Sequence, residues 1–272
     1  QEFTGGLTAF NSDGYTIVHD SDLNSINENG ASIVAWNWKA GGTAVSNTDG
    51  TITTTVSAST EAGFSVFTYT GTGNADSVGH GLGTTPKLVI FKNRDSSSGW
   101  LVLTTAIDGT TDYLSLNLQN TKTDLDTYSM TSSVVNFGGA STPVNASGDG
   151  HVAYAFAEIE GYSKFGSYTG NNSSDGPFVY TGFRPAWLLI KRTDVSSDWV
   201  LVDTARDPFN DFANFLYPNL DNSEDTDAAT EYYDALSNGF KLRYNWTAIN
   251  ALNGAYIYMA FAEQPFKYAN AR

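Results

Sequence analysis

The sequence predicts an all-β protein built from tandem β-sandwich units of a lectin-like or jelly-roll-like kind. Short runs of β-branched and aromatic residues alternate with turns rich in Ser, Asn, Asp and Gly, which is typical of strands joined by tight loops. Only 16% of the 272 residues are charged and 14% are aromatic, a composition that favours strands over helices. The tetrapeptide AFAE also occurs twice, at 155–158 and 260–263, and such self-similarity indicates a structural unit used more than once.

An internal repeat connects the two AFAE copies. Matching residues recur at a constant offset of 99 positions (199 − 100). The clearest pairs are Pro86 and Pro185, Lys92 and Lys191, and Trp100 and Trp199. The stretches that contain them, PKLVIFKNRDSSSGWLVL and PAWLLIKRTDVSSDWVLV, each predict a β-hairpin with a polar turn. The AFAE copies lie 105 positions apart (260 − 155), so the second copy is six residues (105 − 99) longer between its tryptophan and its AFAE, and insertions fall in loops.

The strand that ends in AFAE is expected to present two different faces. In the first copy, Tyr154 and Phe156 alternate with Ala153, Ala155 and Ala157. Since alternate residues of a strand point to opposite faces, one face carries bulk while the other allows a second layer to approach closely. The glutamate is expected to end the strand at solvent.

The first part of the chain, residues 1–60, resembles the back half of the same unit without its front half. It contains a turn at Asp13–Gly14, an alternating strand and an apolar stretch at 31–38 that we expect to be a final strand. The alternation of Ile52, Thr54 and Val56 with polar residues predicts an edge strand. The predicted domains are a partial β unit at 1–60, a first sandwich at 61–163 and a second sandwich at 164–272.

The charge of the chain limits its partners. Twenty-nine acidic residues against 14 basic residues give a net charge of −15, which repels phosphate backbones and anionic lipid, so no nucleic-acid partner is expected. No apolar run approaches the roughly 20 residues of a membrane-spanning helix, so no membrane insertion is expected. The lack of cysteine excludes disulfides, cysteine-ligated zinc and thiol catalysis.

Several stretches spread over nearly the whole chain carry a resemblance to a known family. They are GLTAFNSDGYTI, GASIVAWNWKAGG, AGFSVFTYTGTGNADSVGHGLGTTPKLVIFKNR, GDGHVAYAFAEIEGYSKFGSYTGN, DGPFVYTGFRPAWLLIKRTD, DTARDPFN and YIYMAFAEQPF. They resemble a domain that recurs in structural proteins of marine bacteriophages, among them tail-fibre and adhesin-like virion proteins. The resemblance implies a non-catalytic, lectin-like sandwich on the virion surface, with other virion proteins and host-surface or environmental polysaccharide as partners. It supplies no catalytic residues, and a homo-oligomer is expected.

The densest polar motif, DTARDPFN, predicts a ligand-binding loop in the second unit. It contains Asp203, Arg206 and Asn210, and the ring of Trp246 is expected to be exposed near it. Planar polar groups and aromatic faces together suit the hydroxyls and the apolar side of a sugar ring. The acidic net charge favours a neutral or cationic glycan. Alternatively, Arg206 pairs with a neighbouring carboxylate and pins the loop that leaves the sandwich.

The other tryptophans divide between core and surface. Trp100 and Trp199 are equivalent in the repeat, and both are expected in the core. Trp36 and Trp38 have no such equivalents and are candidates for exposed rings. An exposed indole can stack on the apolar side of a sugar ring.

The segment 219–227 raises the hypothesis of a calcium site, because it holds four carboxylates in nine residues. Asp221, Asp225 and Asp227 would supply the oxygen ligands that suit a hard cation. The glycine of an EF-hand loop is missing, so an ordinary acidic surface loop is the alternative. No other cofactor is expected.

Paired carboxylates leave an enzymatic alternative open, a polysaccharide depolymerase or glycoside hydrolase. Such enzymes need two carboxyl groups about 5–10 Å apart. The candidate pairs are Glu158 with Glu160, which share a face if the strand continues that far, and Asp203 with Asp207. Because Glu263 ends the second AFAE copy as Glu158 ends the first, a role in the fold is favoured for Glu158. A purely architectural virion protein is the third alternative.

The three histidines, His19, His80 and His151, lie in different sequence contexts. His80, between two glycines, is the best candidate for an acid, base or ligand, but a turn histidine that caps backbone groups is the simpler interpretation. The sequence contains no nucleophile-elbow or phosphate-loop pattern in a suitable setting.

Overall fold

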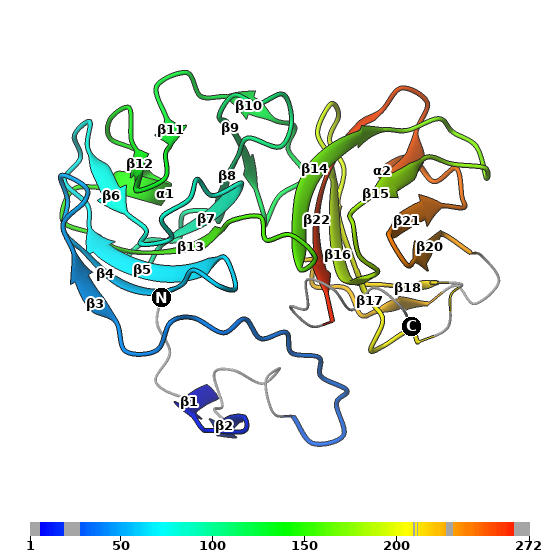
Figure 1. The fold of residues 1–272 in the computed structure, drawn as a ribbon, viewed down its shortest axis with the longest axis horizontal. Coiled ribbons are helices and arrows are strands. Elements are labelled where there is room, and N and C mark those ends of the chain that lie inside the picture. Colours follow the sequence, from blue (N-terminus) through cyan, green and yellow to red (C-terminus); the bar gives the residue numbers. More distant parts are fainter. Residues whose placement is uncertain (1–5, 19–27, 209, 211, 227–230, 264–272) are drawn as a thin grey trace.

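The protein is almost entirely built from antiparallel strands, as the sequence predicts (Figure 1). The computed structural model describes residues 6–18, 28–208, 210, 212–226 and 231–263. Within these ranges the helices are single turns, α1 (Thr142–Asn145) and α2 (Thr247–Asn250), and neither is long and apolar enough to cross a membrane. The all-β prediction is therefore confirmed.

The first unit is a large sheet with a small sheet on one face. In spatial order the eight strands of the large sheet are β10 (Thr123–Asp124), β9 (Asp112–Ser115), β8 (Leu101–Thr104), β7 (Leu88–Asn93), β13 (Gly150–Phe156), β5 (Phe64–Thr70), β4 (Thr54–Ser59) and β3 (Val45–Asn47). The small sheet contains β11 (Ser129–Met130), β12 (Val134–Asn136) and β6 (Ser77–Gly79). Val78 and Val135 of the small sheet share one buried cluster with Phe67, Phe91 and Ala153 of the large sheet, so the two sheets enclose a core.

The second unit has a similar pair of sheets. Its larger sheet contains, in spatial order, β14 (Ser163–Thr169), β22 (Ala255–Ala262), β16 (Pro185–Arg192) and β17 (Trp199–Asp203). Its smaller sheet contains β15 (Phe178–Tyr180), β21 (Gly239–Leu242) and β20 (Tyr233–Leu236). The second unit also contains a hairpin of β18 (Asn214–Phe215) and β19 (Asp225–Thr226). A separate hairpin, β1 (Gly6–Phe10) with β2 (Tyr15–Val18), lies in the N-terminal part of the chain.

The two AFAE strands occupy corresponding places in their sheets. β13 pairs with both β5 and β7, and β22 pairs with both β14 and β16. Beside each strand, a tyrosine hydroxyl donates to a carbonyl of the single-turn helix: Tyr69 to Val144 (2.5 Å) and Tyr168 to Ile249 (2.8 Å). Each AFAE strand is therefore an interior strand on which the rest of its unit is assembled.

The larger sheets of the two units pack against each other through a continuous apolar layer. This shared layer consists of Phe64, Leu88, Val102, Leu114 and Phe156 from the first unit and Phe165, Leu189, Trp199, Leu201, Ile257, Met259 and Phe261 from the second. Tyr154 packs against the same layer, whereas Ala153, Ala155 and Ala157 face the core under the small sheet. The predicted division of β13 into a bulky face and a small-residue face is confirmed.

The N-terminal part departs from the prediction in two ways. Residues 31–41 form no strand but run as an extended segment below both units (Figure 1), so the predicted final strand at 31–38 is wrong. The predicted edge strand lies one place inside the sheet, because β4 pairs with β5 on one side and with β3 on the other.

The two equivalent tryptophans differ in burial. Trp199 is 1% exposed, and its indole Nε1 donates to the carbonyl of Ser115 in the first unit (2.9 Å). Trp100 is only half-buried and stacks on Tyr154, with ring centroids 6.5 Å apart. The core assignment is confirmed for Trp199 and wrong for Trp100, because the first unit covers Trp199 and no described segment buries Trp100 to the same extent.

We expect Trp199→Ala to lower the free energy of unfolding by about 3–5 kcal/mol, as truncation of a fully buried large aromatic does. Trp100→Ala is the matched variant and should cost only about 1 kcal/mol, since its ring already contacts solvent. Urea denaturation of both variants measures the difference. Equal losses would show that partial exposure does not distinguish the two sites.

Candidate functional site

An open cleft of about 620 Å³ lies where the N-terminal segment crosses the second unit. Its wall contains three tryptophans, Trp36, Trp38 and Trp187. Polar and charged residues complete the lining, among them Asn37, Arg184, Asp203 and Glu263. The cleft thus combines aromatic surface with groups that can form hydrogen bonds.

Trp38 fixes the segment against both units. Its ring meets Trp187 and Phe261 of the second unit edge-to-face, with centroids 5.3 and 5.5 Å away, and Phe156 of the first unit at 6.0 Å. Such edge-to-face pairs contribute roughly 0.5–1.5 kcal/mol each beyond the area they bury. The segment therefore has a defined position although it forms no strand.

Asp203 connects this segment to the loop after β17. Its Oδ2 accepts hydrogen bonds from the Trp36 indole Nε1 (3.1 Å) and from Arg206 Nε (2.6 Å). Its Oδ1 accepts from the backbone amides of Ala205 and Arg206, at 3.1 and 3.0 Å. The carboxylate is 4% exposed. With four donors around it, Asp203 orders the loop as the alternative interpretation of DTARDPFN predicts.

The four predicted ligand-binding residues are only partly brought together. Asp203 lines the cleft. Arg206 forms ion pairs with Asp203 and with Glu224 but does not itself line the cleft. Asn210 accepts from the amide of Ala235 (3.1 Å). The described contacts of Asn210 do not reach the cleft.

Trp246, the fourth of these residues, packs as a half-buried ring. It contacts Phe215 and Tyr232, with centroids 5.4 and 5.6 Å away, at the edge of the second unit's own core. Trp246 does not line the cleft.

Sequence reasoning missed Trp187 and Arg184. A signal for Trp187 was present, because Leu88 stands 99 positions earlier (187 − 88), so a tryptophan replaces an aliphatic residue of the first unit. The indole Nε1 of Trp187 is buried and has no hydrogen-bond partner among the described residues. No comparable signal pointed to Arg184, which is exposed at the rim of the cleft.

The carboxylate pairs proposed for hydrolysis are engaged in the fold. β13 ends at Phe156, so Glu158 and Glu160 do not share a continued strand face, and that premise is wrong. Glu158 pairs with Lys164 at 2.6 Å. Asp207, 9% exposed, accepts from the backbone amides of Ala213 and Asn214 at 2.8 and 3.3 Å.

Of the three aspartates predicted to bind calcium in segment 219–227, two lie among the described residues. Asp221 is exposed, and Asp225 accepts a hydrogen bond from the Tyr217 hydroxyl (3.0 Å). Asp227 lies outside the described residues. The grouping of metal-ligating side chains that the described ranges do contain is a different one, Asp108 with Asp112 and Asp124.

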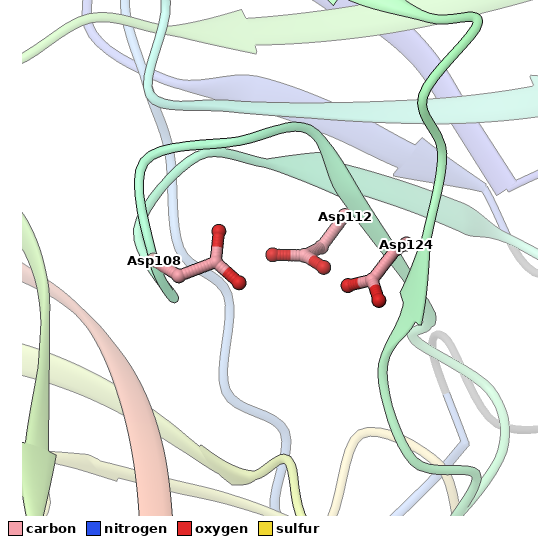
Figure 2. A group of neighbouring side chains, drawn as sticks. All are labelled: Asp108, Asp112 and Asp124. Carbon is pink, nitrogen blue, oxygen red and sulfur yellow. The ribbon is translucent and has the colours of Figure 1, made fainter.

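These three aspartates converge on the β9–β10 hairpin of the first unit (Figure 2). One oxygen of each lies within 4.8 Å of the others. Lys122 Nζ contacts Asp108, Asp112 and Asp124 at 2.8, 3.2 and 2.7 Å. Burial, and then the hydrogen bond that the protonated Asp112 carboxyl donates to Asp124, raise the pKa of Asp112 to about 6. The hydrogen bond that Asp108 accepts from Lys122 holds the pKa of Asp108 well below its usual range.

The described histidines are structural. His80 Nε2 donates to the carbonyl of Thr131 (3.2 Å), and its Nδ1 accepts from the amide of Leu82 (3.2 Å), which confirms the interpretation as a capping residue. His151 is also buried, and its Nδ1 donates to the carbonyl of Asp149 (3.0 Å). Burial lowers the pKa of both His80 and His151. His19 lies outside the described residues.

Because both buried histidines have a lowered pKa, acid should destabilise the fold through them. Below the ordinary pKa of 6.5 the unfolded chain binds protons that the folded protein does not, so stability is lost as the pH falls. Asp112, with its raised pKa, works in the opposite direction. We therefore expect the free energy of unfolding to fall less between about pH 7 and pH 5 in a His80→Gln, His151→Gln variant than in the parent. Equal slopes in urea titrations would contradict this.

The chain matches one family model along nearly its whole length. The family is described as a domain of unknown function (DUF7483), and the match spans residues 1–265. Neither a curated protein nor a solved structure matches the chain. The matched range takes in the N-terminal segment, the cleft and both sandwich units.

Proposed function

The chain belongs to the DUF7483 family, and we propose that it is a non-catalytic module of a virion surface or tail fibre that binds host-surface or environmental polysaccharide. The observation that carries the proposal is the cleft with three tryptophans at the junction of the N-terminal segment and the second unit. The virion setting, with other virion proteins and further copies of the chain as partners, comes from the resemblance to phage structural proteins.

The chemistry of the cleft suits a sugar chain. Indole faces pack on the apolar side of a pyranose ring, while planar polar groups bind its hydroxyls. The side chains of Asn37 and Arg184 are exposed at the cleft and offer such groups. The net charge of −15 disfavours sulfated or uronate-rich polymers, so we propose a neutral or cationic glycan.

The cleft is also held in place before any ligand arrives. Trp36 donates a hydrogen bond to Asp203, and the ring of Trp38 packs against aromatic rings of both units. A site whose side chains are already ordered loses less conformational entropy when it binds. This supports recognition of an extended polymer by a shallow, open cleft.

The enzymatic alternative has less support. In a glycoside hydrolase one carboxyl group donates a proton and a second attacks or activates water. Asp203, the buried carboxylate of the cleft, is bound by four donors and positions a loop. A purely architectural role remains the third proposal, because the large sheets and the shared layer would serve it without any ligand.

A glycan titration tests the proposal. We expect the parent to bind at least one neutral or cationic marine polysaccharide by calorimetry, without release of reducing sugar. An Arg184→Ala, Trp36→Ala double variant should bind at least about tenfold more weakly, because it removes one polar and one aromatic wall of the cleft. Circular dichroism checks that the variant folds.

Trp246→Ala is the matched control, since it removes a half-buried tryptophan outside the cleft. Loss of binding in this variant alone would move the site to the loops around Arg206, Asn210 and Trp246. Release of reducing ends by the parent would favour the depolymerase. No binding to any glycan would leave the architectural role ahead.

A further inference from the structure

The β9–β10 hairpin carries a second feature that the glycan cleft does not use. Asp108 precedes β9, Asp112 begins it and Asp124 ends β10, so the fold brings together carboxylates from positions that span 17 residues. Figure 2 shows the three carboxylates pointing toward one another. Like charges at this distance repel, so the arrangement requires a positive partner.

Asp112 is the residue that indicates a ligand. It is completely buried, and its Oδ1 accepts from Lys122 Nζ at 3.2 Å. Its Oδ2 is also buried, and when Asp112 is ionised no donor group among the described residues reaches this oxygen. A buried, ionised carboxylate oxygen without a donor is costly, whereas a bound cation would satisfy it.

The second unit shows that this hairpin does not need three acidic residues. Asp112 pairs across its hairpin with Asp124, whereas the hairpin beside β17 pairs Asn214 with Thr226. β9 pairs with β8, and Leu216, just after β18, bridges to Leu201 of β17, so the two hairpins occupy corresponding places. Neutral residues therefore suffice to build the hairpin, and the acidic cluster calls for another explanation.

We propose that Asp108, Asp112 and Asp124 bind a hard divalent cation of the calcium type, which displaces the Lys122 ammonium. With all four groups ionised, the cluster carries a net charge of −2 (−3 + 1). The Lys122 side chain is 29% exposed and can turn to solvent, and the exposed Asp108 and Asp124 (45% and 63%) leave an entry path. Calcium takes six to eight oxygen ligands, so three carboxylates and water complete its shell.

The position of the hairpin gives the cation a structural effect. The amide of Lys122 donates to the carbonyl of Thr193 (3.0 Å), and the carbonyl of Gln119 accepts from the amide of Ser197 (2.9 Å). The segment that carries the site therefore docks on the second unit. A cation bound here would stabilise the junction between the units independently of the glycan cleft.

Calorimetric titration of the full chain with CaCl₂ tests the proposal. We expect a single site with a dissociation constant of about 10⁻⁴–10⁻³ M, the range of extracellular modules, and a higher melting temperature in calcium than in EDTA. Lys122→Met should bind roughly tenfold more tightly, because calcium no longer competes with an ammonium group. Asp124→Asn, an exposed substitution that spares the buried Asp112, should bind at least about tenfold more weakly.

Asp225→Asn is the control for the other acidic segment and should bind as the parent does. No calcium heat in either the parent or Lys122→Met would overturn the proposal. If Lys122→Met binds calcium and the parent does not, the proposal is wrong for the natural protein, because Lys122 would then be the permanent counter-ion of the three aspartates. Unchanged affinity in Asp124→Asn, or loss in Asp225→Asn, would place the cation elsewhere.

Discussion

The structure depends on the shared layer, the apolar contact between the larger sheets of the two units. Each interior AFAE strand contributes to it, β13 through Phe156 and β22 through Ile257, Met259 and Phe261. The opposite face of β13 carries the small side chains that let a second sheet approach. Alternation along one strand thus builds two interfaces at once, because successive side chains point to opposite faces. The cores under the two small sheets then belong to single units, while this layer belongs to both.

The candidate cleft and the acidic hairpin both depend on that contact. Trp38 lies at the end of the shared layer and touches Phe156 of one unit and Phe261 of the other, so the N-terminal segment has its observed position only when the units are together. The hairpin with Asp112 reaches across to the strands around Trp199. Binding at either site is therefore linked thermodynamically to the stability of the junction, since a ligand that requires the native arrangement stabilises it.

Much of the fold could be predicted from the sequence, because alternation and repetition report local geometry directly. They predicted the strands, the two faces of β13 and the buried Trp199. The predicted burial of Trp100 was wrong, because equivalence in a repeat does not say which of two residues is covered by the neighbouring unit. Alternation and repetition also failed for residues 31–38, of which Trp36 and Trp38 pack against the shared layer while the backbone does not pair as a strand. Of the sites, Asp203 and Arg206 could be found as a polar motif, but the acidic cluster depends on a hairpin register that the sequence does not display.

Hydrogen exchange in a Phe156→Ala variant tests most directly whether the shared layer couples the two units. The substitution removes a large side chain of the first unit from the layer, at an expected cost of about 3–5 kcal/mol. If the layer makes one cooperative structure, the slow amides of β13 and of β22 lose the same amount of protection, because both exchange through global unfolding. Faster exchange in β13 with unchanged protection in β22 would contradict the account and show that the units unfold independently.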